Sequence, residues 1–122
     1  KESVNVYYDD LMRRFESYEG EYICFEGEVE QVVSDKPQLE LRVATGKQEI
    51  GGYFGSEPTY YYSGDTVYLH SDNYRSERLL VGDKISACGK STGILVYETV
   101  LGNKISVPGI KIETGQIKRI NL

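Results

Sequence analysis

The first regular pattern of apolar and polar residues lies near the start of the chain and has the period of a helix. In the segment VYYDDLMRRFESYEG (6–20), the apolar side chains spaced three or four positions apart are Tyr8, Leu11, Phe15 and Tyr18. This spacing places them on one face of an α-helix. The pattern therefore predicts a helix over about 6–19 that packs on the core through this face. A helix that binds a partner is the alternative.

From residue 21 onward, apolar residues alternate with polar ones, which is the period of a half-buried β-strand. The alternating segments are 21–33, 39–45, 66–72, 83–90 and 93–113, and Gly102-Asn103 predicts a hairpin within the last of them. The inward face of 21–33 includes Gly27 and Val33. We expect a core of Ile23, Phe25, Val29, Leu41, Val43, Leu69, Ile85 and Ala87, covered by Leu11 and Phe15.

One helix followed by five or six short strands predicts a mainly β fold, a small closed barrel with an N-terminal α-helix. The segments FEGEV (25–29) and VGDKISACGKSTG (81–93) resemble strands one and four of an OB-fold, and YETVLGNKISVPGIKI (97–112) resembles its closing segment. The resemblance is to bacterial domains of the tRNA-anticodon-binding type in Gram-positive lipoproteins and membrane-tethered proteins. It implies one OB-like domain over 1–122, with the barrel at about 20–113 and a C-terminal tail at 114–122.

In an OB-fold, strands one and four are antiparallel neighbours, which suggests a register for this chain. If Glu28 lies opposite Lys84, inward residues of complementary size face each other, and a slip of one residue would lose this match. The inward pairs are then Ile23–Gly89, Phe25–Ala87 and Gly27–Ile85, and the outward pairs are Tyr22–Lys90 and Cys24–Cys88.

The two cysteines of the chain, Cys24 and Cys88, allow two interpretations. They are too few for a disulfide framework, and their spacing is not that of a C-x-x-C metal or redox motif. They are either two free, half-buried thiols or a disulfide across the two strands. A disulfide would imply an oxidising compartment.

Composition and charge restrict the possible functions. The chain has 122 residues, 39% of them hydrophobic and 27% charged, which is typical of one folded globular domain. No apolar run approaches the roughly 20 residues of a membrane helix. The net charge is −5, with no basic run, so nucleic acid is predicted to be a less favoured partner. The chain begins at Lys1 and its single methionine is Met12, which suggests an extracytoplasmic (secreted, lipid-anchored or membrane-tethered) protein or an excised domain.

The sequence contains no pattern typical of an enzyme, and we predict that the protein is not one. His70 is the single histidine, which excludes a site built from several histidines. No G-x-S-x-G segment positions a nucleophile. The row Glu26, Glu28 and Glu30 is expected to be a solvated face of its strand, with calcium binding the alternative. We therefore expect no cofactor and no metal.

Aromatic residues are concentrated in the connection YFGSEPTYYYSGD (53–65). Rigid amphipathic tyrosines among glycine and serine are typical of binding surfaces, and aromatic rings also stack on bases in OB-folds. The alternative is that the tyrosines only cover the barrel. OB-folds bind on the face of strands two and three and on adjoining loops, here 34–38 and 91–103. The predicted ligand-binding residues are Tyr53, Tyr60, Tyr61, Tyr62, Tyr68 and Tyr97.

From these patterns we expect a non-enzymatic binding or structural module that recognises a protein or a glycan. The first alternative is an OB domain that binds single-stranded nucleic acid or oligonucleotides. The second is an accessory domain of a larger enzyme or assembly. The ligand, the biological process and the oligomeric state are not specified by the sequence.

Overall fold

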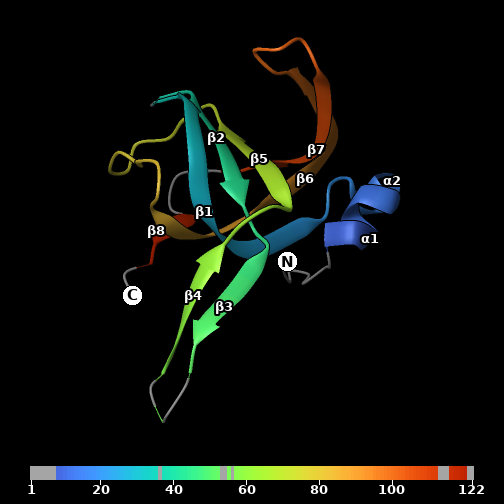
Figure 1. Ribbon diagram of the computed structural model, residues 1–122. Helices are drawn as coiled ribbons and strands as arrows, with labels where there is room; N and C mark the ends of the chain where they lie inside the picture. Colours follow the sequence, from blue (N-terminus) through green and yellow to red (C-terminus); the bar gives the residue numbers. More distant parts are fainter. Residues whose placement is uncertain (1–7, 36, 53–54, 56, 113–115, 121–122) are drawn as a thin grey trace.

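The computed structural model describes residues 8–35, 37–52, 55, 57–112 and 116–120, in which two short helices precede eight strands (Figure 1). The helices are α1 (Tyr8–Arg13) and α2 (Phe15–Tyr18). The strands are β1 (Tyr22–Ser34), β2 (Leu39–Ala44), β3 (Lys47–Gly51), β4 (Pro58–Tyr62), β5 (Thr66–Ser71), β6 (Lys84–Glu98), β7 (Lys104–Lys111) and β8 (Ile117–Arg119).

Five of these strands form a closed ring. Their order is β1-β2-β5-β7-β6, and pairing of β1 with β6 closes it. This architecture agrees with the small closed β barrel of five or six strands that the sequence predicts. Residues 117–119, within the expected C-terminal tail, instead form β8 on the free side of β6. Neither α1 nor α2 has the length and apolar character that crossing a bilayer requires.

The register between β1 and β6 is the predicted one. Its pairs include Tyr22–Lys90, Ile23–Gly89, Cys24–Cys88, Phe25–Ala87, Gly27–Ile85 and Glu28–Lys84. A methyl group on Gly27 would lie 2.4 Å from the carbonyl oxygen of Ala44, and one on Gly89 would lie 2.3 Å from that of Lys111. Glycine is therefore required where neighbouring strands pass close to β1 and β6. Cys24 and Cys88 form a disulfide, with their Cα atoms 4.0 Å apart.

The core is close to the predicted set. Ile23, Val29, Leu41, Val43, Leu69, Ile85, Ala87 and Leu11 are buried. Phe25 and Phe15 are only half-buried, because Phe25 packs against the edge of the core cluster and Phe15 lies on the short helix α2, outside that cluster. Val33 is 47% exposed, against expectation. Irregularities between Val29 and Gln31 and between Val32 and Ser34 shift the alternation, so that Val32 packs against the core instead.

The N-terminal helix is broken, where the apolar stripe predicted a single helix over 6–19. Arg14 has φ −127° and ψ 37°, outside the helical region. Isolated helices this short are marginal in water, so packing decides their path. The break brings the ring of Phe15 beside Gly93 of β6, and the amide of Gly20 donates to the carbonyl of Ser91 at 2.7 Å.

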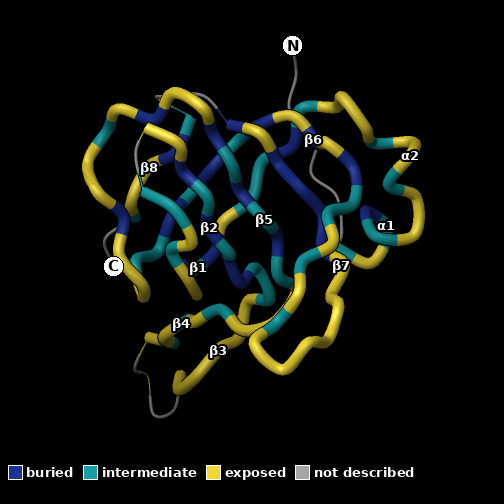
Figure 2. The backbone as a smooth tube through the Cα atoms, turned by 90° about the horizontal axis from the view of Figure 1, so that it is seen from above, coloured by how far each residue is buried: buried dark blue, intermediate teal, exposed yellow. Residues whose placement is uncertain are grey.

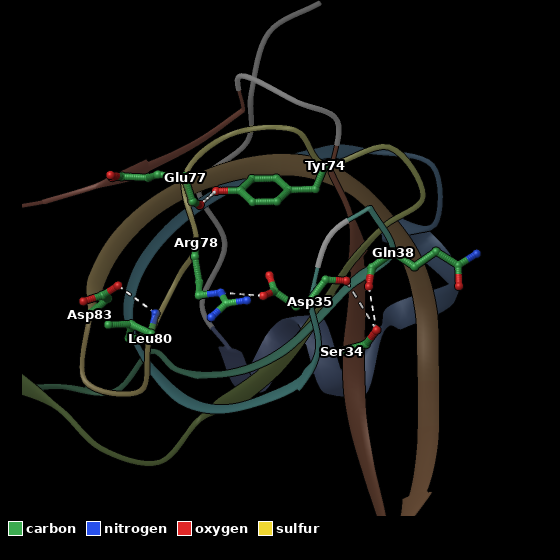
Figure 3. Close-up of polar contacts among 8 residues, drawn as sticks. All are labelled: Ser34, Asp35, Gln38, Tyr74, Glu77, Arg78, Leu80 and Asp83. Atoms are coloured by element: carbon green, nitrogen blue, oxygen red, sulfur yellow. Dashed lines mark hydrogen bonds and ion pairs between the residues drawn. The ribbon is translucent and has the colours of Figure 1, made fainter.

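The connection between β5 and β6 has no helix, and polar contacts hold it against the turn after β1 (Figure 3). Arg78 Nε lies 2.7 Å from Asp35 Oδ2. Tyr74 is buried. Its hydroxyl donates a hydrogen bond to the backbone carbonyl of Glu77 at 2.5 Å, and its backbone amide donates one to the carbonyl of Pro37 at 2.9 Å. This end of the barrel is therefore fixed on both sides of the 34–38 turn.

Two hairpins extend beyond the barrel. The β3–β4 hairpin projects at the bottom of Figure 1, and the end of β6 that pairs with the start of β7 projects at the top. Both hairpins are largely exposed (Figure 2). The sequence predicted a connection over 91–103, but β6 continues to Glu98 and the turn spans Thr99–Asn103. Gly93, with φ +87°, forms a bulge that bends β6 without ending it.

Candidate nucleic-acid interface

A cation and two aromatic rings meet on the outer face of the barrel. Tyr68 of β5 and Tyr97 of β6 have ring centroids 6.4 Å apart and an interplanar angle of 39°. The guanidinium carbon of Arg42 on β2 lies 4.7 Å from the centroid of the Tyr97 ring. Arg42 and Tyr68 are direct cross-strand partners. The extended part of β6 therefore carries Tyr97 back toward the β2–β5 face.

These three side chains line a hollow of about 260 Å³. Its other walls are Gln31, Val33, Glu98, Thr99 and Val100. On the other side of Tyr68 lies a hollow of about 280 Å³, bounded by Glu40, His70, Asp72 and Leu95 among others. Tyr68 thus stands between two depressions of one continuous surface, with a ring accessible to a planar ligand.

Hydrogen bonds hold the side chains of this face in place. Arg42 Nη1 donates to Gln31 Oε1 at 2.9 Å, and the Tyr68 hydroxyl donates to Glu40 Oε1 at 2.5 Å. Burial, followed by the bond to Glu40, raises the pKa of Tyr68, which keeps its hydroxyl protonated. Arg42 Nε is buried and has no acceptor among the described residues. The face therefore combines fixed rings with a guanidinium.

His70 extends this face toward the basic side of the barrel. It pairs with Glu40 on one side and Lys111 on the other, and its Nε2 lies 3.2 Å from Thr92 Oγ1. Burial and then Lys111 lower the pKa of His70, and Asp72 and Glu40 oppose this effect. His70 is thus held mainly neutral at pH 7, next to a lysine.

The tyrosines of the connection between β2 and β5 lie on the β3–β4 hairpin. Tyr60 and Tyr62 share one face of it, and Tyr61 lies on the other. Lys47 Nζ lies 4.3 Å from the Tyr60 ring centroid, and the Tyr62 hydroxyl donates to Glu26 Oε1 at 3.2 Å. Tyr53 is outside the described residues. The ring contact within the predicted set is the one between Tyr68 and Tyr97.

The acidic row of β1 lies toward this hairpin. Glu26 accepts from Tyr62, and Glu30 accepts from Thr66 Oγ1 at 2.7 Å. In the part of the chain that the structure describes, no group of three or more His, Cys, Asp or Glu side chains is arranged to hold a metal ion. The carboxylates give the hairpin side of the barrel a negative charge.

Another hollow, of about 300 Å³, lies between α1 and the end of the barrel. Its lining includes the core residues Leu11, Ile23, Val67 and Ile110, the rings of Tyr8 and Phe25, and the charged residues Glu26, Lys47 and Asp65. The ring–ring contact of Tyr68 with Tyr97 and the guanidinium over Tyr97 lie outside this hollow. The Tyr68–Tyr97 face is the better candidate for an extended ligand.

Sequence reasoning did not select Arg42 or Lys111 as site residues. Arg42 is a polar position of an alternating strand, and Lys111 follows the apolar run of β7. Their role depends on which strands are neighbours, and in particular on the parallel pairing of β5 with β7. The closing OB-fold resemblance could have pointed to that pairing.

Comparisons with known proteins identify the fold. No family model matches the chain, and no curated protein matches it. Among solved structures, the small single-stranded DNA-binding protein from Streptomyces coelicolor matches with a TM-score of 0.56 and 16% identity, over 83% of this chain and 94% of that one. The fold is an OB-fold.

Two further matches have lower TM-scores. A mitochondrial single-stranded DNA-binding protein of S. cerevisiae has a TM-score of 0.42 and 10% identity, over 84% of this chain and 97% of that one. The Plasmodium falciparum SSB in complex with single-stranded DNA has a TM-score of 0.42 and 14% identity, over 83% and 93%.

These comparisons correct two sequence-based predictions. The expected protein- or glycan-binding module, with nucleic acid a less favoured partner, is wrong, since the matched structure with the higher TM-score is named as a single-stranded DNA-binding protein. The OB-fold resemblance is confirmed, but the Streptomyces coelicolor protein is named neither as a tRNA-anticodon-binding domain nor as a lipoprotein. The first prediction rested on the net charge of −5, which limits the neutralisation of phosphates but not stacking on aromatic rings.

Proposed function

We propose that this chain binds single-stranded DNA, without catalysis, on the outer face formed by Arg42, Tyr68 and Tyr97. The observation that carries the proposal is the stacking geometry of these three side chains on an OB-fold. Aromatic side chains stack on bases of any sequence, and arginine adds a cation for the backbone. The Streptomyces coelicolor protein supports the ligand class, since it has this fold and is named for that ligand.

The negative net charge of −5 is compatible with this function if stacking provides most of the affinity. Few lysines and arginines lie on the face, so few phosphates would be neutralised there. The part of the binding that this face provides should therefore depend only weakly on salt. Repulsion from the acidic row of β1 should also keep the strand away from the hairpin side.

The ligand class is tested by fluorescence anisotropy with a labelled oligo(dT) and with a labelled duplex of the same length. The proposal predicts saturable binding of the single strand, competition by unlabelled oligo(dT), and much weaker binding of the duplex, whose bases are already stacked. Equal binding of the two, or no binding of the single strand at low salt, would contradict it. Tyr61→Ala is the control variant, because it removes a ring of the same kind from the β3–β4 hairpin, which carries none of the three proposed binding residues.

An extracytoplasmic location remains a prediction. The Cys24–Cys88 disulfide supports it, because disulfides persist in oxidising compartments. A single strand bound there would be DNA outside the cytoplasm. Alkylation of thiols in freshly lysed cells of the source organism, before any oxidation, would show whether the bond exists in the cell.

A further inference from the structure

A second cluster of polar side chains lies around the barrel from the Tyr68–Tyr97 face. Its residues occupy successive strands in one row of direct cross-strand partners. The row runs from Glu40 (β2) to His70 (β5), Lys111 (β7), Lys90 (β6) and Tyr22 (β1). Neighbouring strands lie about 4.8 Å apart, so Lys90 is roughly 10 Å from His70 across the sheet.

The far end of this row is built from hydrogen-bond donors. Among the residues that the structure describes, Tyr22, Lys90, Lys111 and Gln116 line a hollow of about 250 Å³. Gln116 Nε2 donates to the Tyr22 hydroxyl, which fixes both side chains. The nearby carboxylate of Asp72 lies 3.6 Å from Lys111 Nζ. The Lys111 side chain is 50% exposed and that of Asp72 is 73% exposed. An exposed pair of this kind is weak and can be exchanged for another anion.

The two lysines of this hollow lie close enough for their positive charges to repel each other. Lys90 and Lys111 are direct partners on antiparallel strands, where like charges destabilise the pairing. Asp72 contributes one negative charge to this pair of positive charges. An anion in the hollow would neutralise the remainder.

We propose that this Lys90–Lys111 hollow binds a backbone phosphate of the single strand whose bases stack at Tyr68 and Tyr97. The inference rests on the proposed function and assigns the strand a direction across the barrel. From Tyr68 it passes His70 to the lysine pair, away from the acidic row at Glu26 and Glu30. A path of this length lies within the roughly 4–16 nucleotides that one OB-fold covers.

The test is the salt dependence of oligo(dT) binding by the Lys90→Gln/Lys111→Gln double variant. Each lost phosphate contact lowers the slope of log K against log salt by about 0.7 for a single strand, so the double variant, which loses one such contact, should lose about 0.7. Lys84→Gln/Lys118→Gln is the matched control: it removes the same charge from β6 and β8, outside the row, and should keep the wild-type slope. An unchanged slope in the first variant, or an equal loss in both, would overturn the inference.

Two further arms separate this inference from the proposed function. An oligonucleotide of about 4 bases, at the lower end of OB-fold site sizes, should bind wild type and the Lys90→Gln/Lys111→Gln variant alike, while one of about 12 should distinguish them. Inorganic phosphate alone should shift the Lys90 and Lys111 amide signals in NMR spectra and, at high concentration, should weaken oligo(dT) binding to the wild type more than to the Lys90→Gln/Lys111→Gln variant. Equal weakening of both proteins would overturn the inference. Failure of the wild type to bind any oligo(dT) would overturn the proposed function and this inference together.

Discussion

Arg42 and Tyr97 are 55 positions apart in the sequence. In the folded chain the guanidinium carbon of Arg42 lies 4.7 Å from the centroid of the Tyr97 ring. Arg42 belongs to β2 and Tyr97 to β6, which are not neighbours in the ring of strands. The contact therefore spans the outer face and positions the β6–β7 extension over it. A cation over a tyrosine ring also leaves the other face of the ring for stacking.

The hairpin tyrosines should contribute less to binding than the barrel face. Tyr60→Ser/Tyr62→Ser removes two partly exposed rings from a hairpin that projects from the barrel, so the melting temperature should hardly change. Affinity for oligo(dT) should stay close to that of the wild type, because the proposed path of the strand does not cross the hairpin. Thermal denaturation and anisotropy measure the two effects. A loss of several kcal/mol in stability would show that these rings are structural.

The core residues should differ in their effect on stability according to their burial. Leu41 is fully buried, and Leu41→Ala should lower the free energy of unfolding by about 2–5 kcal/mol. Phe25 is half-buried, so Phe25→Ala should cost about 2 kcal/mol, less than a fully buried phenylalanine. Urea denaturation of both variants gives the comparison. A larger loss for Phe25 than for Leu41 would contradict the burial of the two side chains.

The disulfide should stabilise the barrel by lowering the conformational entropy of the unfolded chain. Cys24 and Cys88 are 64 positions apart, and closing such a loop contributes about 4 kcal/mol in the chain-entropy model. Cys24→Ala/Cys88→Ala should therefore be less stable than the oxidised wild type, and reductant should affect the wild type alone. Thiol titration of the denatured, unreduced protein should find no free thiols. Two free thiols would show that the bond is absent.

Much of this fold follows from local sequence patterns, and the exceptions have physical causes. The β1–β6 register could be predicted because Gly27 and Gly89 must face bulky partners. Val33 could not be placed, since irregular positions in β1 change which side chains point inward. The helix break at Arg14 depends on packing against β6, which a helical stripe does not encode.

The geometry of the proposed site follows from the sequence only in part, for a related reason. Tyr68 and Tyr97 were selected as aromatic residues near the ligand-binding face of an OB-fold. Their contact with each other, and with Arg42, requires β6 to extend past Gly93 and fold back toward β2. The alternation of apolar and polar residues predicts where the strands lie, but it does not predict the curvature of β6. The charge of the whole chain also hides the separation of Glu26 and Glu30 from Lys90 and Lys111.

His70 gives a prediction for pH dependence. Burial and Lys111 lower its pKa in the folded state below the ordinary value of 6.5. The unfolded chain then binds the proton more readily, so stability is fully present above about pH 6.5 and falls as pH decreases toward the folded pKa. His70→Gln should remove this part of the pH dependence in urea denaturation between about pH 5 and 7. An unchanged pH profile in that variant would contradict the assignment.

The same residue should report on the ligand. His70 is the single histidine, so its ring signals in NMR spectra are unambiguous. A phosphate nearby favours the charged imidazolium, so bound oligo(dT) should raise the pKa of His70. By linkage, affinity should then increase as pH falls from about 7 to 5. A lower pKa in the complex would place the strand elsewhere.

The central claim is that single-stranded DNA stacks on the Tyr68–Tyr97 face. The most direct test compares the oligo(dT) affinity of the Tyr97→Ala variant with that of the Tyr97→Phe variant. Loss of one stacked base costs about 1–3 kcal/mol, so the alanine variant should bind roughly 5- to 150-fold more weakly. The phenylalanine variant keeps the ring and should bind nearly as the wild type does. Wild-type affinity in Tyr97→Ala, with its fold intact by circular dichroism, would contradict the account.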